Sequence, residues 1–404
     1  MSRSWPSDQD ASGRSFHGRE LEYLQEVLAS GQLNSTRGKF SARMEKAFAD
    51  LIGAPAVSCA SGTAAVHVAI AALDLEPGSE VITSPLTDFG GVAGILWQGC
   101  IPVFADVDPV SLNITAETVA ARITPRTRAV IVTHLFGNPA DVREILKVVD
   151  RLGIPVIEDC AQAYGATLDG RHVGAFGALA CFSLQQTKHI TTGEGGVVTA
   201  NGAAFFERAH QFVNKARIYT DEIAEHHFLS LNYRMTELQA AVGAAQLERL
   251  PDLLAARRNA ANALEAQLSG LEGLRLIKPL PGATQSFWRI ALHIDEQIVD
   301  GGMARYAMAL KDLGVLGVMP GYQRPAYEWK AVKEQRTFGT SRYPFTLADP
   351  EAVDYAPERF PGVQRARAGV LVLPWNERYG IQEVNDLAQR MADAYHELAR
   401  NTNS

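Results

Sequence analysis

The chain has 404 residues and a formal net charge of −7. This length suits one large domain with a smaller one, or two to three ordinary domains. A content of 47% hydrophobic and 21% charged residues is typical of a protein with a packed core. The acidic balance, without a contiguous basic run, argues against nucleic acid or an anionic membrane as a partner.

The cysteines and the N-terminus indicate the cellular compartment. The cysteines are widely spaced and form no Cys-x-x-Cys pair: Cys59, Cys100, Cys160 and Cys181. This pattern favours free buried thiols in a reducing compartment over a zinc site, so we expect no metal. The polar N-terminus lacks the apolar core of a signal peptide, and no apolar run reaches membrane-spanning length. These features predict a soluble cytoplasmic protein.

Helical and strand patterns alternate after about fifteen residues, which we expect to be a flexible lead-in. Apolar spacing predicts helices at 19–28 and 41–51 and an alanine-rich helix from Ser61 to Leu73. Short apolar runs predict strands at 80–83, 101–106, 129–133, 155–159, 179–183 and 196–199, with helices at 116–121 and 142–152. This alternation predicts a mostly parallel sheet covered on both faces, with ligands at the carboxyl ends of its strands.

The C-terminal part reads as a smaller α/β domain. A long helical stretch covers 235–268 and breaks near Pro251. Strands are predicted at 286–294 and 370–373, and a helix at 381–398. We therefore expect a large domain at 1–255, which carries the candidate site, and a small domain at 256–404.

An acid and a lysine at strand ends suggest a chemistry. Asp159 closes an apolar run, and Lys188 follows Ser183 and precedes the glycine-rich stretch 191–196. Such a set can hold a phosphorylated aldehyde cofactor as a Schiff base. The lysine supplies the imine, the acid pairs with a pyridine ring nitrogen, and hydroxyls and glycine amides hold a phosphate.

Each of these residues also has an ordinary structural explanation. Ser61-Gly62-Thr63-Ala64 at a helix start is either an anion site or a plain N-cap. Asp159 either pairs with a pyridinium nitrogen or belongs to a strand-end hydrogen-bond network. Gln162 either bonds a phenolic oxygen or is a polar turn residue. Lys188 in isolation suggests a solvated side chain, but its neighbours favour an enclosed site that lowers its pKa.

Other enzyme classes lack their usual motifs in this chain. Neither Gly-x-Gly-x-x-Gly, a Walker motif, Gly-x-Ser-x-Gly nor His-Glu-x-x-His occurs. Dehydrogenase, NTPase, serine-hydrolase and zincin functions therefore lose support. We expect His134, at a strand end, to be structural, while His189 is ambiguous.

Taken together, four ordered segments resemble the DegT/DnrJ/EryC1/StrS family of pyridoxal-phosphate sugar aminotransferases. They are Ser61-Gly62-Thr63-Ala64-Ala65, Glu158-Asp159-Cys160-Ala161-Gln162-Ala163, the block 182–196, and Asn232-Tyr233-Arg234-Met235-Thr236-Glu237-Leu238-Gln239. The similarity is strongest over 31–250. It implies the α/β fold type I of pyridoxal-phosphate transferases. That fold has a mainly parallel seven-stranded sheet between helices in the large domain and a smaller C-terminal α/β domain.

The resemblance also implies roles for single residues. Lys188 would form the Schiff base with pyridoxal 5'-phosphate (PLP, or PMP in its aminated form), and Asp159 would face the ring nitrogen. Gln162 would lie near the ring and its phenolic oxygen. Thr63, Ala64 and Ser183 would hold the phosphate, and Ser61 and Gly62 of the same motif would also contact the cofactor. Asn232 would reach across the interface of a homodimer with two shared active sites.

One position departs from the family pattern. Family members place an aromatic residue on the cofactor ring after the strand near residue 82. Here the sequence is Ser84-Pro85-Leu86-Thr87-Asp88-Phe89, which aligns Asp88 with that position. Either a local shift of the chain brings Phe89 to the stacking position, or another residue covers the cofactor ring.

The resemblance implies transfer of an amino group from glutamate or glutamine to a keto sugar, often nucleotide-linked, or a cyclitol ketone, in amino-sugar or natural-product biosynthesis. Two alternatives remain: a PLP-dependent sugar dehydratase of the same fold, and a non-catalytic regulatory protein. Some dehydratases carry histidine in place of the lysine, so Lys188 favours transamination. Further residues are candidate substrate contacts or structural residues: Glu194, Lys215, Tyr322, Trp375 and Asn376.

Overall fold

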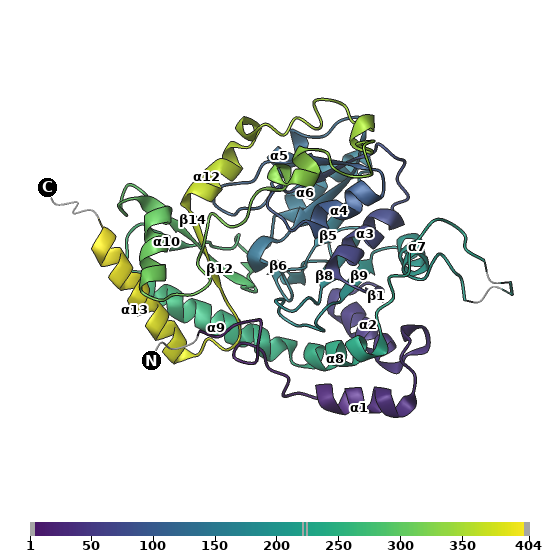
Figure 1. The fold of residues 1–404 in the computed structure, drawn as a ribbon, viewed down its shortest axis with the longest axis horizontal. Coiled ribbons are helices and arrows are strands. Elements are labelled where there is room, and N and C mark those ends of the chain that lie inside the picture. Colours follow the sequence, from purple (N-terminus) through teal and green to yellow (C-terminus); the bar gives the residue numbers. More distant parts are fainter. Residues whose placement is uncertain (1–4, 220–221, 224, 400–404) are drawn as a thin grey trace.

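A seven-stranded sheet forms the centre of the computed structural model, which describes residues 5–219, 222–223 and 225–399 (Figure 1). Its strand order is β1 (Ala56–Cys59), β9 (Gly196–Ala200), β8 (Leu179–Ser183), β5 (Val156–Asp159), β4 (Thr127–Thr133), β2 (Glu80–Thr83) and β3 (Ile101–Phe104). β9 runs antiparallel to both of its neighbours, whereas the other adjacent pairs are parallel. The predicted mainly parallel seven-stranded sheet is confirmed.

Helices cover both faces of this sheet, and strand residues alternate between them. On β8, Leu179 and Cys181 join the core formed with α3 (Gly62–Ala72) and α7 (Ala203–Val213). Ala180 and Phe182 instead join the core formed with α1 (Glu20–Ser30), α2 (Lys39–Ile52) and α8 (Glu237–Glu248). Successive strand side chains point to opposite faces. Both faces are buried, so the strands read in sequence as continuous apolar runs.

The predicted elements of the large domain are largely present. α5 (Ala116–Ala120) and α6 (Val142–Val149) lie near their expected positions, but β1, α7 and α4 (Gly90–Trp97) were not predicted. α8 ends at Glu248 and α9 (Leu250–Leu268) begins two residues later, with Pro251 in its first turn. Proline suits a first turn because its missing N–H has no helical partner there. The predicted break near Pro251 is confirmed.

A second, antiparallel sheet forms the small domain. Its order is β10 (Leu274–Leu276), β12 (Arg289–Ile294), β14 (Val370–Pro374) and β13 (Met319–Pro320). One face packs on α9, α10 (Gly302–Asp312) and α13 (Ile381–Leu398), and the other joins the core of the large domain through Ala291, Val370 and Val372. The predicted boundary at residue 255 falls inside α9 and stays a prediction.

Short elements join the two sheets. A three-stranded sheet pairs β11 (Ala283–Thr284) with β6 (Thr167–Leu168), and β6 with β7 (Arg171–His172). After β13, the chain returns to the large-domain core through α11 (Lys330–Lys333) and α12 (Pro361–Gly369). Asp106 accepts hydrogen bonds from the Gly362 and Val363 amides at 2.7 and 3.0 Å. It therefore caps α12 against the end of β3.

The expected flexible lead-in is not what the structure shows for residues 5–15; residues 1–4 lie outside the described part. Asp8 and Arg14 are 5% and 4% exposed, and the Arg14 guanidinium donates to the backbone carbonyl of Lys188. The prediction rested on polar composition. It was wrong for this segment because its polar groups bond to residues distant in the sequence.

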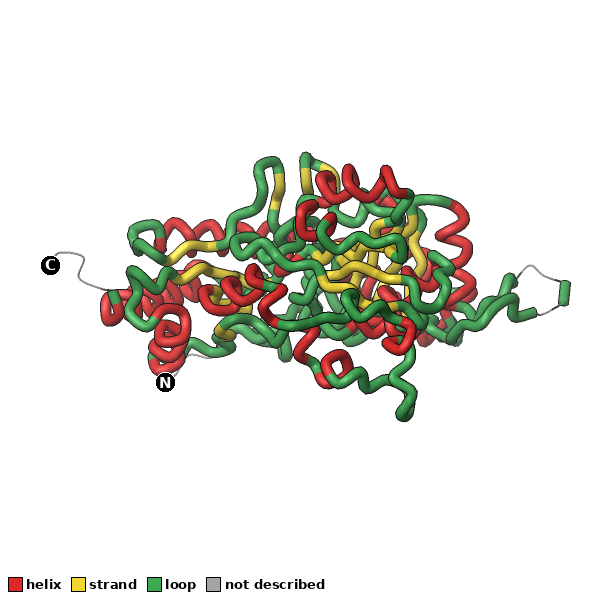
Figure 2. Tube along the Cα trace, turned by 90° about the horizontal axis from the view of Figure 1, so that it is seen from above, coloured by secondary structure: helices red, strands yellow, loops and turns green. Residues whose placement is uncertain are grey.

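One segment projects from the molecule. Seen along two directions, the body is elongated and the stretch between α7 and α8 extends away from it (Figures 1 and 2).

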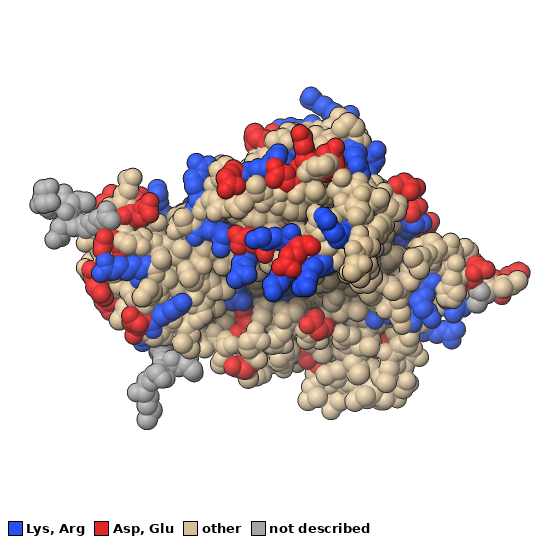
Figure 3. All heavy atoms as spheres, turned by 45° about the horizontal axis from the view of Figure 1, so that its top comes forward, with Lys and Arg blue, Asp and Glu red and all other residues tan. Residues whose placement is uncertain are grey.

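The surface carries mixed charge: basic and acidic side chains are interspersed on the face shown in Figure 3. Within the described ranges, none of the helices combines the length and apolar composition that a membrane span requires.

Candidate active site

A cavity of about 400 Å³ lies at the carboxyl ends of β5 and β8. Seven of the residues predicted to hold the cofactor line it together: Ser61, Gly62, Thr63, Asp88, Asp159, Ser183 and Lys188. Ligands collect at this edge of a parallel sheet because the strand ends and helix starts meet there. The structure thus brings the acid, the lysine and the α3 helix start to one hollow.

The start of α3 forms one end of the cavity. Ser61 is the N-cap, and its hydroxyl accepts a hydrogen bond from the buried Ala64 amide at 3.1 Å. The first helical hydrogen bond is donated by the Ala65 amide, so the amides of Gly62 and Thr63 precede it. A Cβ on Gly62 would lie 2.6 Å from the Cβ of Ser183, which is why glycine is needed for this close approach. The Ser61 cap and the predicted anion site can therefore coexist, because the cap uses the Ala64 amide and leaves the amides of Gly62 and Thr63 outside the helical hydrogen bonds.

Asp159 is buried at the end of β5, with 7% of its surface exposed. One carboxylate oxygen accepts a hydrogen bond from the Ala161 amide at 3.1 Å. Burial raises the pKa of Asp159, although this hydrogen bond and the nearby Lys188 act in the opposite direction. A cationic group in the cavity would therefore stabilise the charged form of this carboxyl.

Lys188 lies in the same cavity with its amine desolvated. Burial lowers the pKa of Lys188 to about 8, while Asp159 and Asp88 oppose this shift and Arg289 adds to it. Its Nζ lies 4.3 Å from the ring centroid of Trp288, which also lines the cavity. The Trp288 indole donates to the Thr187 carbonyl at 2.7 Å and so holds the ring beside the lysine. Sequence reasoning missed Trp288.

Asp88 and Phe89 directly precede α4 but have different surroundings. Asp88 lines the cavity, and its carboxylate accepts from the Gly90 amide at 2.9 Å. The Phe89 ring is 42% exposed and meets the ring of Trp329 edge-on, with centroids 5.5 Å apart. The structure brings Asp88, and not Phe89, to the cavity wall.

Gln162 is buried and does not line the cavity, and two hydrogen bonds hold its side chain. Its amide oxygen accepts from the Phe136 backbone at 2.8 Å, and the side chain also hydrogen-bonds the hydroxyl of Tyr322. Burial raises the pKa of Tyr322 to about 12, so this hydroxyl stays protonated near neutral pH. Tyr322 has a φ of 60°, a conformation rare for a bulky residue. The small domain thus contributes a strained aromatic residue to this region.

His134, Glu158 and Cys160 offer possible metal-ligand atoms within 4.8 Å of one another. Glu158, however, already accepts four hydrogen bonds, at 2.7–3.1 Å, from the His134 ring and from the amides of Gly174, Phe176 and Gly177. His134 in turn accepts from the Ala140 amide at 3.1 Å. This set fixes the loop after β7, in keeping with the structural role predicted for His134.

The other sequence candidates lie in different places. Glu194 lines the cavity, whereas Asn232 and Lys215 are exposed outside it. Trp375 and Asn376 are fully buried, and their side chains donate to the carbonyls of Arg257 and Pro6, each at 3.1 Å. These bonds assign structural contacts to Trp375 and Asn376.

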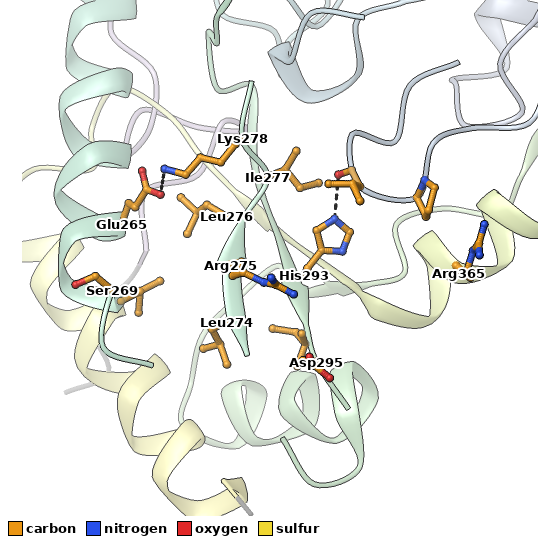
Figure 4. Close-up of a pocket in the computed structure, with 14 residues that line it drawn as sticks. Glu265, Ser269, Leu274, Arg275, Leu276, Ile277, Lys278, His293, Asp295 and Arg365 are labelled. Atoms are coloured by element: carbon orange, nitrogen blue, oxygen red, sulfur yellow. Dashed lines mark hydrogen bonds and ion pairs between the residues drawn. The ribbon is translucent and has the colours of Figure 1, made fainter. Parts of the chain in front are cut away.

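A larger hollow of about 590 Å³ lies on the small domain, beside α9 and β10 (Figure 4). Two of its polar side chains are already engaged: Lys278 pairs with Glu265, and the His293 ring hydrogen-bonds the Val110 carbonyl at 2.9 Å. None of the residues predicted for catalysis lines it. The cavity at β5 and β8 is therefore the candidate active site.

Comparison with known proteins identifies the family. The chain is 34% identical to GDP-perosamine synthase of Vibrio cholerae over 70% of this chain and 77% of that protein. It is 36% identical to L-glutamine:2-deoxy-scyllo-inosose aminotransferase of Streptomyces kanamyceticus over 69% of this chain and 67% of that protein. Its fold superposes on the aminotransferase from Psychrobacter cryohalolentis with a TM-score of 0.85 at 29% identity, covering 96% and 98% of the two chains. The DegT/DnrJ/EryC1/StrS aminotransferase family matches residues 15–375, so the chain belongs to this family and is an aminotransferase.

Proposed function

We propose that the protein uses PLP to move an amino group from glutamate or glutamine to a keto sugar or a cyclitol ketone in amino-sugar or natural-product biosynthesis. The observation that carries this proposal is the shared cavity of Lys188, Asp159 and the α3 helix start. Relatives named for GDP-perosamine and for 2-deoxy-scyllo-inosose support the two acceptor classes. The name of the second relative also supports glutamine as donor.

The residues present fit the cofactor at both of its polar ends. The α3 amides and the hydroxyls of Ser61, Thr63 and Ser183 suit a phosphate, helped by the helix dipole. The buried Asp159 suits a protonated ring nitrogen because burial raises its pKa and a cation would offset that cost. Lys188, with a pKa near 8, is partly neutral at physiological pH and so can form an imine.

The bound cofactor supplies an electron sink that makes loss of a proton from the donor's α-carbon possible. Once the donor's amine has displaced it from the imine, the neutral Lys188 Nζ would take this proton and return it, because a neutral amine is a competent proton acceptor near pH 8. The charged Asp159 would stabilise a protonated ring nitrogen. The Trp288 ring shields Nζ from water on one side.

A homodimer with shared sites is part of the proposal. Asn232 lies outside its own cavity and is exposed, although its motif position implies contact with a cofactor phosphate. The same projecting stretch carries apolar side chains in water, with Ile223 at 82% and Leu229 at 96% exposure. A second copy of the chain would cover these side chains and receive Asn232. The four cysteines, all buried and unpaired, support a reducing cytoplasm as the compartment.

The test follows the visible absorption of the purified protein loaded with PLP. Glutamate or glutamine should abolish the imine band and release the corresponding 2-oxo acid, and a keto sugar or inosose should restore the band. Lys188→Ala and Lys188→Arg should lose transamination by at least about 100-fold because the imine-forming base is removed. Lys278→Ala, which alters a surface lysine paired with Glu265, is the matched control.

Full transamination by either Lys188 variant would contradict the assignment. Consumption of a sugar substrate by elimination, without a 2-oxo acid from the donor, would indicate the dehydratase. Absence of any imine band in the wild-type protein would favour a non-catalytic role.

A further inference from the structure

A buried charge cluster lies beside the proposed active site and joins parts of the chain that are distant in sequence. It contains three guanidinium groups and two carboxylates: Arg14, Arg257, Arg289, Asp8 and Glu377. Asp8 and Arg14 come from the N-terminal segment and Arg289 from the first position of β12. The cluster thus carries one more positive than negative group.

Two of the three arginines already make several hydrogen bonds within the protein. Arg257 donates to the carbonyls of Trp375 and Phe287 at 2.8 and 3.2 Å and pairs with Glu377 at 2.9 Å. Arg14 donates to the carbonyls of Lys188 and His189. These bonds fix both side chains as structural supports of the site.

Arg289 is different. Among the residues that the structure describes, its only ion-pair or hydrogen-bond partner is Asp8, at a long 3.4 Å. Its Nε, like that of Arg257, is buried without a hydrogen-bond partner, but 14% of the Arg289 side chain is exposed, whereas Arg257 has no exposed side-chain surface. A buried guanidinium nitrogen without an acceptor costs free energy, so this one is suited to a ligand acceptor.

Arg289 is also close to the reacting lysine. Its guanidinium carbon lies 4.7 Å and Lys188 Nζ lies 4.3 Å from the same Trp288 ring centroid, so these atoms are at most about 9 Å apart. Their charges interact, since Arg289 contributes to lowering the pKa of Lys188. Arg289 is not part of the cavity lining itself, but an amino acid whose amine reacts at the position of Nζ, with its α-carboxylate turned toward Trp288, would approach this guanidinium.

We propose that Arg289 binds the α-carboxylate of the amino donor. The inference rests on the proposed function, because the donor is the molecule whose amine must come to Lys188. A carboxylate matches the planar guanidinium fork, and its single negative charge balances the excess of the cluster. A nucleoside diphosphate carries more negative charge than the cluster can balance and needs more than one such group.

The test measures binding without turnover. The probe is 4-carbamoylbutanoate, which is glutamine without its amine, titrated calorimetrically into the cofactor-loaded protein. Arg289→Gln should weaken binding about ten- to a hundredfold, as for loss of a charge-assisted hydrogen bond, and Arg289→Lys should lie between because it keeps the charge but not the fork. Arg275→Gln, which removes an exposed arginine of β10, should bind like the wild type.

Kinetics separate the two half-reactions. With Arg289→Lys or Arg289→Gln, the donor KM should rise about tenfold or more while the acceptor KM stays unchanged. Unchanged probe binding by both variants, or weaker binding of GDP instead of the probe, would overturn the inference. A wild-type protein that does not react with glutamate or glutamine would overturn the proposed function instead. Thermal unfolding of each variant shows whether it is folded.

Discussion

Glu158 and Asp159 are adjacent acids at the end of one strand, yet their surroundings are opposite. Glu158 accepts four hydrogen bonds, and these outweigh its burial, so its pKa is lowered. Asp159 accepts one backbone hydrogen bond, and burial raises its pKa. Alternation along a strand sends the two side chains to opposite faces. One acid is therefore committed to structure, while the other remains available for a cationic ligand.

Lys188 shows how a buried amine becomes reactive. Its pKa of about 8 lies below the ordinary 10.5 because burial disfavours the ammonium form. Since the folded chain gives up this proton more readily than the unfolded chain, the contribution of Lys188 to stability rises with pH between these two values. Below the folded pKa the desolvation penalty applies in full, and only a minority of the lysine is neutral.

This predicts the pH dependence of imine formation. When PLP is added to the cofactor-free protein, the rate of band formation should rise with pH and reach its midpoint near 8. Asp88→Asn should move the midpoint down, because Asp88 stabilises the ammonium, and Arg289→Gln should move it up. Stopped-flow absorbance between pH 6 and 10 measures these midpoints. A wild-type midpoint near 10 would show that Lys188 is not desolvated.

At the scale of elements, the contact between the start of α3 and the end of β8 determines the shape of the anion site. Gly62→Ala would place a Cβ 2.6 Å from Ser183 Cβ and 2.7 Å from its hydroxyl. The expected result is a loss of about 1–3 kcal/mol of stability by overpacking, together with weaker PLP binding. Thermal unfolding and cofactor titration measure both.

Two further variants sharpen this prediction. Gly270→Ala is the control, because a Cβ at this exposed glycine meets nothing within 4 Å. In the double variant Gly62→Ala/Ser183→Gly, stability should partly return because the colliding atoms are gone, while PLP binding should stay weak without the hydroxyl. Normal stability and PLP binding in Gly62→Ala would show that the contact is not tight.

The same contacts explain what could be predicted from the sequence. Asp159, Ser183 and Lys188 were predictable because strand ends and the glycines near them leave local patterns. Trp288 and Arg14 carry no such signal, since their bonds to Thr187 and Lys188 join residues 101 and 174 positions apart. The polar composition of residues 5–15 predicts flexibility, because the distant partners of their charged groups cannot be recognised from the sequence. The sequence aligned Asp88 with the ring-stacking position, which stays a prediction, and Asp88 does line the cavity. The exposed position of Phe89, whose ring packs on Trp329, left no local pattern.

At the scale of the whole molecule, the two sheets and the N-terminal segment meet at the candidate site. β12 supplies Trp288's neighbour Arg289, the segment after β13 supplies Tyr322, and residues 5–15 supply Asp8. Each of these lies outside the seven-stranded sheet that carries Lys188. The position of the small domain therefore determines the geometry around the lysine. In the proposed homodimer, Asn232 and the projecting stretch would contact the other copy of the chain.

The proposed homodimer with shared sites makes a specific prediction for mixed dimers. Lys188→Ala and Asn232→Ala should each be nearly inactive as homodimers. A heterodimer of the two, isolated with two different affinity tags, has one site that combines the intact Lys188 of one subunit with the intact Asn232 of the other. It should show about half of the wild-type activity, because one of the two sites of a twofold dimer is complete.

The contrary outcome is equally clear. If each site used only its own chain, one site of the heterodimer would lack the lysine and the other the asparagine, and activity would not exceed the mean of the two homodimers.

Gel filtration tests the proposed dimer contact of the projecting stretch. Replacing the exposed Leu229 by Asp should shift the protein toward the monomer, because a buried carboxylate in an apolar contact is costly. The same change at Leu316, a 60% exposed leucine of the small domain, should leave the dimer intact.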